Sequence, residues 1–328
     1  MSSVSIILPV YNGEKFIKGT INSILTQDFC DFELIIIDDG STDNSLKIIK
    51  EFALNDKRIV LISQKNKGIC ISRNIGIAIS KSPFIMFCDH DDIFLPGYIK
   101  QAFNDIFYGN FDFVKYGCIE IYVNDSGEYK RNVNALNDAI YTNTKKMLFE
   151  FTNYNEYIWD GIYTKDILTK ICGFDSWYKA GCEDIDLMLK LVTNSKNCKT
   201  SHLTFYEHFI RNSSSTSRKF NENTYEAVIR ILLKRLNVVE GTKIQLEEYK
   251  SKKNAQFLWS ILGMFSFKNC NLTFYEIKDR LKKISSLDAF KSHLTFGKNS
   301  TSKKIVILLF KLKLFSILST ICIFKRLI

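Results

Sequence analysis

The chain has 328 residues, of which 46% are hydrophobic and 24% charged, a composition typical of a globular protein with a sizeable core. Its nine cysteines are odd in number and include no Cys-X-X-Cys pair, which argues against a disulfide framework or a zinc site and favours a reducing compartment. The net charge of +10 is unevenly spread: residues 1–215 carry 23 basic and 27 acidic side chains, whereas residues 216–328 carry 22 and 8. The two parts are therefore expected to face different partners or surfaces.

The first 90 residues alternate between short apolar runs and amphipathic segments. Helices are predicted from Gly13, from a start that Asp43 can cap, and over residues 68–80. Buried strands are predicted for four continuous apolar runs, at residues 3–10, 32–38, 58–63 and 83–89. Continuous apolar strands that alternate with helices indicate an α/β fold, with a mostly parallel sheet covered by helices on both faces.

Polar clusters follow three of these predicted strands. The cluster "YNG" follows the first strand, "DDGSTD" the second and "DHDD" the fourth. Because ligands bind at the carboxyl ends of strands in open parallel sheets, the three clusters predict a single site.

The pattern changes after residue 110. Residues 111–123 and 127–133 predict a hairpin. A helix is expected near residues 144–152, another over residues 184–194, and a strand over residues 200–210. The polar run "RNSSSTSRK", residues 211–219, is the best candidate for a domain boundary, which gives one domain over residues 1–215 and a second region over residues 216–328.

The second region is predicted to be helical and basic, with an apolar tail over residues 303–328. The longest uncharged run of this tail, Leu314 to Phe324, has 11 residues, short of the ~20 that a spanning helix needs. Two interpretations stay open. The tail is either a terminal helix packed on the basic region or, as we prefer, a segment in the membrane interface with its lysines at the headgroups. The excess of positive charge favours an anionic membrane surface as a partner.

Asp89, Asp91 and Asp92 place three carboxylates within four positions. Carboxylates this close repel one another unless they take up protons or a cation lies between them. Their hard oxygen atoms suit Mg²⁺ or Mn²⁺ as a cofactor rather than zinc. The alternative is a solvated loop that caps the next helix.

Taken together, these motifs resemble family 2 glycosyltransferases, which are inverting enzymes of the GT-A fold. The resemblance rests on "SIILPVYNGEKFIKGTINSILTQDFCDFELIIIDDGSTDNS", "NKGICISRNIGI" and "PFIMFCDHDD", which follow one another at the intervals usual in that family. It is dense over residues 1–95, looser to residue 215, and absent from the basic helical region. It implies a metal-dependent hexosyltransferase of the capsule and lipopolysaccharide type.

The resemblance also implies site residues. The positions expected to bind the nucleotide are Pro9, Tyr11, Asp39, Asn66, Arg73, Asp89 and Asp91. Among them, Tyr11 would stack on uracil and Asp39 would bond the base imide. The expected metal ligands are Asp91 and Asp92, and the sequence leaves open which of the two is the principal one.

The segment "AGCEDIDLMLKLV" supplies the expected catalytic residues, Glu183 and Asp184. Without the family, two acids at the start of a helix merely complement its dipole. The resemblance implies that Asp184 is the general base, which takes the proton of the acceptor hydroxyl, and that Glu183 contacts the acceptor or orders the loop. Asp186 is expected to face solvent.

The roles of one aromatic residue and of two basic residues stay open. Trp159 either stacks on a sugar or lies in the core. In related enzymes a basic residue or a His after the strand near residues 200–210 touches the diphosphate or the metal, and the register does not decide between His208 and Arg211.

The expected function is transfer of a sugar from a nucleotide-diphosphate donor, most often UDP in this family, to a glycan or lipid-linked acceptor in surface polysaccharide synthesis. The alternative is an inactive scaffold that binds a nucleotide sugar in a polysaccharide-synthesis complex. No nucleic-acid motif accompanies the basic charge, so nucleic acid is not an expected partner. The N-terminus lacks the pattern of a signal peptide, and the expected location is cytoplasmic, peripheral on the inner face of the cell membrane.

Overall fold

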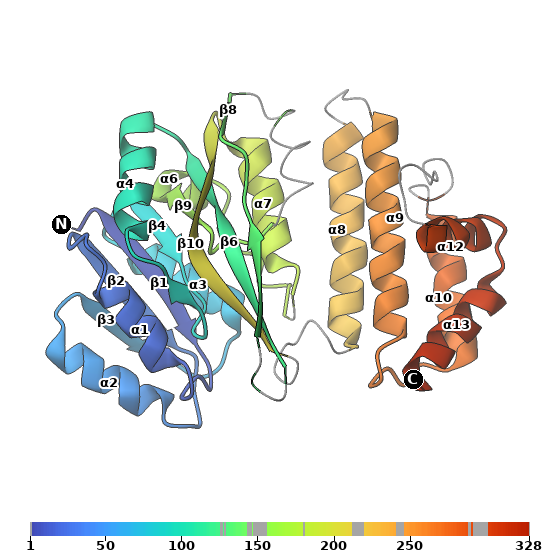
Figure 1. Ribbon diagram of the computed structural model, residues 1–328, viewed down its shortest axis with the longest axis horizontal. Coiled ribbons are helices and arrows are strands. Elements are labelled where there is room, and N and C mark those ends of the chain that lie inside the picture. The colour runs from blue at the N-terminus through green and yellow to red at the C-terminus, as the bar shows by residue number, and fades with distance from the viewer. Residues whose placement is uncertain are drawn as a thin grey trace. The chain divides into compact units, whose positions relative to one another are not determined.

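The computed structural model describes residues 2–124, 127, 129–142, 146, 156–179, 181–211, 220–240, 246–287, 290 and 301–327. The chain divides into two compact units (Figure 1). The first comprises Met1–Lys179 and Glu183–Ser214, and the second comprises Ala180–Cys182 and Ser215–Ile328. Apart from residue 146, the helix predicted near residues 144–152 lies outside the described residues.

The first unit begins with four parallel strands in the order β3-β2-β1-β4. Each lies within the range predicted for it: β1 (Val4–Val10), β2 (Phe32–Asp38), β3 (Ile59–Ser63) and β4 (Phe84–Phe87). All residues of β1 and β2 are buried, which explains why their sequences show no alternation between apolar and polar residues. The parallel order brings the carboxyl ends of these strands to one edge of the sheet, as predicted.

The second half of the sheet is mixed. Its strands are β5 (Ile93–Phe94), β6 (Phe113–Val123), β7 (Tyr129–Asn134), β8 (Ala139–Tyr141), β9 (Gly161–Thr164) and β10 (Cys198–Arg211). The predicted hairpin is confirmed as the antiparallel pair β6 and β7. β9 runs antiparallel between β4 and β6, and β10 lies parallel to β6. β5 pairs with β10, so the segment after "DHDD" is joined to a strand more than 100 residues later.

Helices cover both faces of this sheet (Figure 1). They are α1 (Ile17–Leu25), α2 (Ser45–Asn55), α3 (Ile69–Ile79), α4 (Tyr98–Gly109), α6 (Lys165–Lys170) and α7 (Glu183–Asn194). Alternate residues of β1, including Ile6 and Leu8, share one core with α1 and α4. Ile7 points to the other face, where α3 approaches so closely that a Cβ at Gly76 would lie 2.5 Å from the Ile7 side chain. The glycine therefore lets this helix lie against the sheet.

The second unit is helical, as predicted. Its described helices are α8 (Glu222–Glu240), α9 (Leu246–Phe265), α10 (Phe274–Ser286), α12 (Thr301–Lys311) and α13 (Phe315–Leu327). A capping box starts α10, in which Thr273 and Glu276 bond each other's backbone N–H groups. None of the described helices combines the length and the apolar character that crossing a membrane requires.

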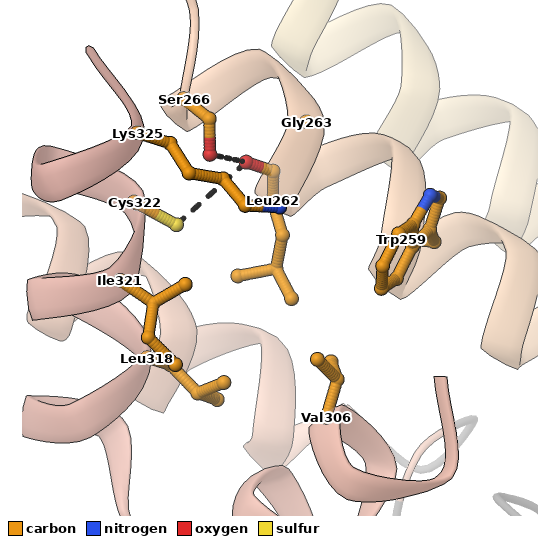
Figure 2. A pocket seen from close by; sticks show the side chains of 9 residues that line it. All are labelled: Trp259, Leu262, Gly263, Ser266, Val306, Leu318, Ile321, Cys322 and Lys325. Atoms are coloured by element: carbon orange, nitrogen blue, oxygen red, sulfur yellow. Dashed lines mark hydrogen bonds between the residues drawn. The ribbon is translucent and has the colours of Figure 1, made fainter. Parts of the chain in front are cut away.

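The apolar tail is two helices rather than one. α12 ends at a turn in which Lys313 has a positive φ of 56°, and α13 then packs on α9 and α10. The inner side of α13 is buried at Leu318, Ser319 and Cys322. A cavity of about 100 Å³ remains between α9, α12 and α13, with walls that include Leu262, Val306 and Ile321 (Figure 2). The interpretation of the tail as a packed terminal segment therefore holds for one side of each helix.

Candidate active site

Two of the three polar clusters are bonded directly to each other. After β1, the N–H groups of Asn12 and Gly13 donate to the Ser41 and Ser45 hydroxyls of the cluster that follows β2. Thr42 returns a backbone bond to the Asn12 side chain. The third cluster adjoins them, because the ring of His90 lies against Gly13, where an added Cβ would come within 2.4 Å of it. The strand ends thus form one continuous surface.

Asp39 is buried at the end of β2, where it orders the loop that leads to α3. Its Oδ1 accepts bonds from the N–H of Lys67 and the amide of Gln64, both at 2.8 Å, and its Oδ2 accepts the N–H of Gly68 at 2.8 Å. The predicted nucleotide residues Tyr11 and Asn66 are exposed, Tyr11 with 47% of its surface. Both are close to Asp39 in space: the Asp39 N–H bonds the carbonyl of Val10, which precedes Tyr11, and the Asn66 backbone nitrogen lies against Gly40, which follows Asp39.

Pro9 lies inside β1 and is buried, with Ile37 of β2 as its register partner. It shapes the sheet under the polar clusters rather than their exposed surface.

Arg73 is the centre of the site. Its side chain is 2% exposed, so it is not a surface arginine although it lies on a helix. Nη2 donates to Asp89 Oδ1 at 2.9 Å, and Nη1 donates to Asp184 Oδ1 at 2.9 Å and Glu183 Oε1 at 3.3 Å. One guanidinium from α3 therefore holds together the acid after β4 and the acid pair at the start of α7. Burial opposes its charge, but these three carboxylates raise its pKa far above the usual arginine range.

Asp184 keeps an elevated pKa despite this ion pair. Burial raises the pKa to about 7, the charges of Glu183 and Asp89 act in the same direction, and Arg73 opposes them. A carboxylate with such a pKa accepts a proton readily at neutral pH and stays largely ionised above it.

Asp91 and Asp92 have different surroundings. The Asp91 side chain is 29% exposed, and its Oδ2 accepts a bond of 2.6 Å from Arg211 Nη1. That guanidinium lies 3.9 Å from the centre of the Phe16 ring, a cation–π contact that ties the end of β10 to the loop before α1.

Asp92 is fully buried and holds β10 in place. Its Oδ2 accepts the Tyr206 hydroxyl at 2.8 Å and pairs with His208 Nδ1 at 3.0 Å, while its Oδ1 accepts the Phe209 N–H at 2.9 Å. Burial raises the pKa of Asp92 to about 6, against the opposing effect of His208. Burial alone would lower the pKa of His208, but its bond to Asp92 and the nearby acids raise it to about 9. Between about pH 6 and pH 9, Asp92 is ionised and His208 is protonated, so the two side chains form an ion pair.

The donor set fits a hard divalent cation better at Asp91 than at Asp92, because all described contacts of Asp92 are internal and its side chain is 0% exposed. Asp89, 26% exposed, adds a second carboxylate near the surface. Within the described residues, no group of three or more His, Cys, Asp or Glu side chains is arranged to hold a metal ion. Mg²⁺ is commonly held by one or two carboxylates together with substrate phosphates, so a pair of acids is sufficient in principle.

The aromatic segment around Trp159 is packed inward. Trp159 is 2% exposed and stacks between Tyr157, at 4.5 Å between ring centres, and Tyr206, at 4.2 Å. Of its two predicted roles, the core one is therefore the observed one. Beside it, Lys115 forms a buried ion pair with Asp160 and also bonds the Tyr157 carbonyl.

The expectation that Asp186 faces solvent is wrong. It is 1% exposed, accepts a bond from the Tyr178 hydroxyl at 3.2 Å and pairs with Lys190 one turn later. The helical spacing of Leu187 and Leu191, both buried, indicates the inner side of α7 but does not reveal that Tyr178 covers Asp186 from outside the helix.

Sequence reasoning missed Tyr206 and left His208 and Arg211 undecided, although both basic residues pair with the acid cluster. A signal was present: residues two apart on a strand share a face, so Tyr206 and His208 had to point the same way. The sequence did not reveal β5 as a partner strand of β10, because β5 has only two residues.

The glycosyl transferase family 2 model matches residues 5–167. Among curated proteins, the chain is similar to the uncharacterized glycosyltransferase YibD of Escherichia coli K12, with 24% identity over 263 residues that cover 75% of this chain and 74% of that protein. It is also similar to glycosyltransferase GlyG of Streptococcus pneumoniae, with 30% identity over 179 residues, 46% of this chain and 60% of that protein. Glycosyltransferase GlyA of the same species is 26% identical over 261 residues, which cover 75% of this chain and 36% of that protein. The chain thus spans about three quarters of one relative and less than two thirds of the other two.

Among solved structures, the chain is similar to Staphylococcus aureus TarS 1–349, with a TM-score of 0.63 and 21% identity, over 97% of this chain and 90% of that one. The same protein in complex with UDP-GlcNAc matches with a TM-score of 0.63 and 17% identity, over 94% and 92% of the two chains. At these identities the likeness concerns the fold, and it confirms the expected α/β class of the GT-A type.

The raised pKa of Asp184 predicts a pH-dependent difference between wild type and Asp184→Asn. The folded chain binds the Asp184 proton up to about pH 7, whereas an unfolded carboxyl loses it near 3.8. The folded state therefore binds more protons in this window, so the free energy of unfolding of the wild type falls as pH rises from about 4 to 7. The Asn variant lacks this loss and is expected to gain stability relative to wild type over the same window.

Urea unfolding at pH 4.5, 6 and 8 measures this difference, with Glu51→Gln, on the exposed side of α2, as the control. A stability of Asp184→Asn relative to wild type that stayed constant, or fell, as pH rose would contradict the raised pKa.

Proposed function

Residues 5–167 place this chain in glycosyl transferase family 2, and on that premise we propose that it moves a hexose, with inversion, from a UDP-sugar to a hydroxyl of a glycan or lipid-linked acceptor. The observation that carries the proposal is the position of Arg73 between Asp89, at the strand end expected to hold the donor, and Asp184, at the position expected for the base. The TarS structures with UDP and with UDP-GlcNAc support a uridine nucleotide as donor.

On the donor side, Tyr11 stacks on the uracil ring and Asp39 accepts its imide N–H. The exposure of Tyr11 leaves room for such a ring. Asp39 is already fixed by the N–H groups of Lys67 and Gly68, so the loop with Asn66 and the carboxylate that reads the base are ordered together. Asp89 is positioned by Arg73 toward the ribose and diphosphate.

In the proposed reaction, Asp184 removes the proton of the acceptor hydroxyl. The acceptor oxygen forms its bond to the anomeric carbon as the bond from that carbon to the diphosphate breaks, and the electron pair leaves with UDP. A pKa near 7 matches a base that works at neutral pH. Glu183, on the same guanidinium, orders the loop or contacts the acceptor.

A divalent cation, Mn²⁺ or Mg²⁺, is proposed at Asp91 with Asp89. When bound, such an ion neutralises the charge that develops on the leaving diphosphate. Arg211 positions the Asp91 carboxylate through its bond of 2.6 Å, and the buried Asp92–His208 pair fixes the strand that carries Arg211.

A peripheral position on the cytoplasmic face of an anionic membrane is proposed for the second unit. The exposed apolar residues of α12 and α13 recur at helical spacing and form one stripe on each helix: Ile305 and Leu308 on α12, continued by Leu312 just after it, and Ile317, Ile321 and Phe324 on α13, preceded by Leu314. Lys304 and Lys325 lie exposed beside these stripes. Apolar residues inserted between headgroups, with lysines at the phosphates, suit an anionic lipid surface.

The first prediction from this proposal concerns the base. Asp184→Asn keeps the size of the side chain but removes its basicity, so turnover is expected to fall by about 10²–10⁴ while UDP binding survives. Steady-state transfer assays and calorimetry with UDP measure the two effects. Glu183→Gln is the matched variant and is expected to lose less turnover.

More than half of wild-type turnover in Asp184→Asn would require another base, with Glu183 next in line. A wild-type chain that bound UDP-sugars without any turnover would be the inactive scaffold.

The second prediction separates the two candidate ligands of the cation. Asp91→Asn is expected to remove the part of UDP binding that depends on Mn²⁺ and is lost in EDTA. Asp92→Asn is expected to keep that dependence but to lower the free energy of unfolding by about 1–3 kcal/mol, because it weakens a buried, charge-assisted network. The reverse pattern would place the cation at Asp92, and full activity in EDTA would rule out a required cation.

The third prediction tests the apolar stripes. The full chain is expected to float with anionic vesicles of phosphatidylglycerol at low salt and not with neutral phosphatidylcholine. Replacing Leu308, Ile317 and Phe324 by Gln is expected to abolish flotation. Replacing Leu54, Phe107 and Val133, exposed residues of the first unit, is the matched control and should leave it intact. Wild-type chain that stays in the soluble fraction would contradict the membrane surface.

A further inference from the structure

A second cavity of the helical unit, which we call the lysine cavity, has a volume of about 680 Å³. Three lysines line it: Lys282 near the end of α10, Lys311 at the end of α12, and Lys313 in the turn before α13. None of the described residues that line it is acidic. Lys311 already takes part in another interaction, so the positive potential of the cavity is attributed to Lys282 and Lys313, and a bound anion relieves the repulsion between these two.

The floor of the lysine cavity is aromatic. Phe290, Phe310 and Phe315 are each at most 6% exposed, and the ring centres of Phe310 lie 5.6 Å from those of the other two. Ser285 and Ser286 also line the cavity, and their hydroxyls donate to the carbonyls of Lys282 and Lys283. A rim of cations over an apolar floor fits a ligand with an anionic end and an apolar body.

The backbone at Lys313 is an independent observation. The N–H of Lys313 bonds the Phe310 carbonyl and the N–H of Leu314 bonds the Leu309 carbonyl, the two bonds of a Schellman motif at the end of α12. Lys313 occupies the left-handed position of that motif, with φ 56°, where glycine is favoured because it has no Cβ. Glycine at position 313 would therefore remove the lysine charge from the cavity without straining the turn.

We propose that the lysine cavity binds the phosphate group of an amphiphile, with the lysines on the phosphate and the phenylalanines against its apolar chain. The source is either a lipid headgroup or a soluble phosphate compound. The lipid source rests on the membrane surface proposed above, whereas the phosphate site itself does not.

Titration calorimetry of the full chain tests this with soluble dihexanoyl phosphatidic acid, dihexanoyl phosphatidylcholine and inorganic phosphate. The test variant is Lys282→Gln with Lys313→Gly. Glycine at position 313 should raise the melting temperature of the chain or leave it unchanged, so a loss of binding in this variant is not caused by unfolding. The control is Lys278→Gln with Lys283→Gln, which removes the same charge from the exposed side of α10 outside the cavity.

The phosphatidic acid is expected to bind wild type and control alike, the phosphatidylcholine to bind more weakly, and the test variant to bind the phosphatidic acid about thirtyfold more weakly. Inorganic phosphate that binds as tightly as the lipid, and is lost in the test variant, would support a phosphate site with a soluble source and overturn the contact of an apolar chain with the phenylalanines. Phosphatidic acid binding that is absent from wild type, unchanged in the test variant, or equally reduced in the control would overturn the proposal.

Flotation of the same variants keeps this outcome apart from the membrane proposal. If all variants float with anionic vesicles while calorimetry shows no loss in the test variant, the membrane surface stands and the lysine cavity falls. If the test variant loses phosphatidic acid in solution and wild type fails to float, the phosphate site stands with a soluble source and the membrane surface falls.

Discussion

The buried guanidinium of Arg73 is the interaction on which the rest of the site depends. It joins Asp89, just after β4, to Asp184, which lies 111 residues after Arg73 in the sequence. Without this cation, three acids would face one another in a mostly buried place and would have to take up protons or move apart. Removing one partner of a buried ion pair commonly costs about 3–5 kcal/mol. The same contact limits how far burial raises the pKa of Asp184. Arg73, which holds the proposed donor side of the site to the proposed acceptor side, therefore also lowers the pKa of the proposed base.

The second constraint is the pairing of β10 with β5. This pairing brings Tyr206 and His208 to Asp92, and Arg211 to Asp91. The two neighbouring acids therefore have different partners and different exposure. Asp92 becomes a structural anchor inside the protein, and Asp91 stays near the surface with an arginine that fixes its direction. Charge density along the chain does not distinguish Asp91 from Asp92. The division arises because successive residues at a strand end point to different surroundings.

The sequence predicted the first four strands, the helices between them and the edge where the polar clusters meet, because each of these follows from local patterns within a few residues. Asp39, Asp89 and Asp184 were predicted as site residues through motifs of the same local kind, and the structure places all three beside the ends of buried strands or at a helix start. The contacts of Arg73, the core position of Trp159 and the burial of Asp186 were not predictable in this way. Each depends on a partner brought in by the fold: Asp184 for Arg73, Tyr206 for Trp159 and Tyr178 for Asp186.

The tail shows how one wrong local assumption hides a pattern. Projected as a single helix, residues 303–328 place apolar side chains on nearly every side, which suggests no amphipathic character. The turn at Lys313 divides the tail into two helices with separate phases. Phe315, Leu318 and Cys322 then fall on the buried side of α13, and Ile317 and Phe324 fall on the exposed side. A sequence with apolar residues on two sides of each helix is what a segment requires when one side packs on protein and the other meets lipid. The lysine that ends the first helix in a left-handed conformation is therefore both the cause of the division and a wall of the cavity beside it.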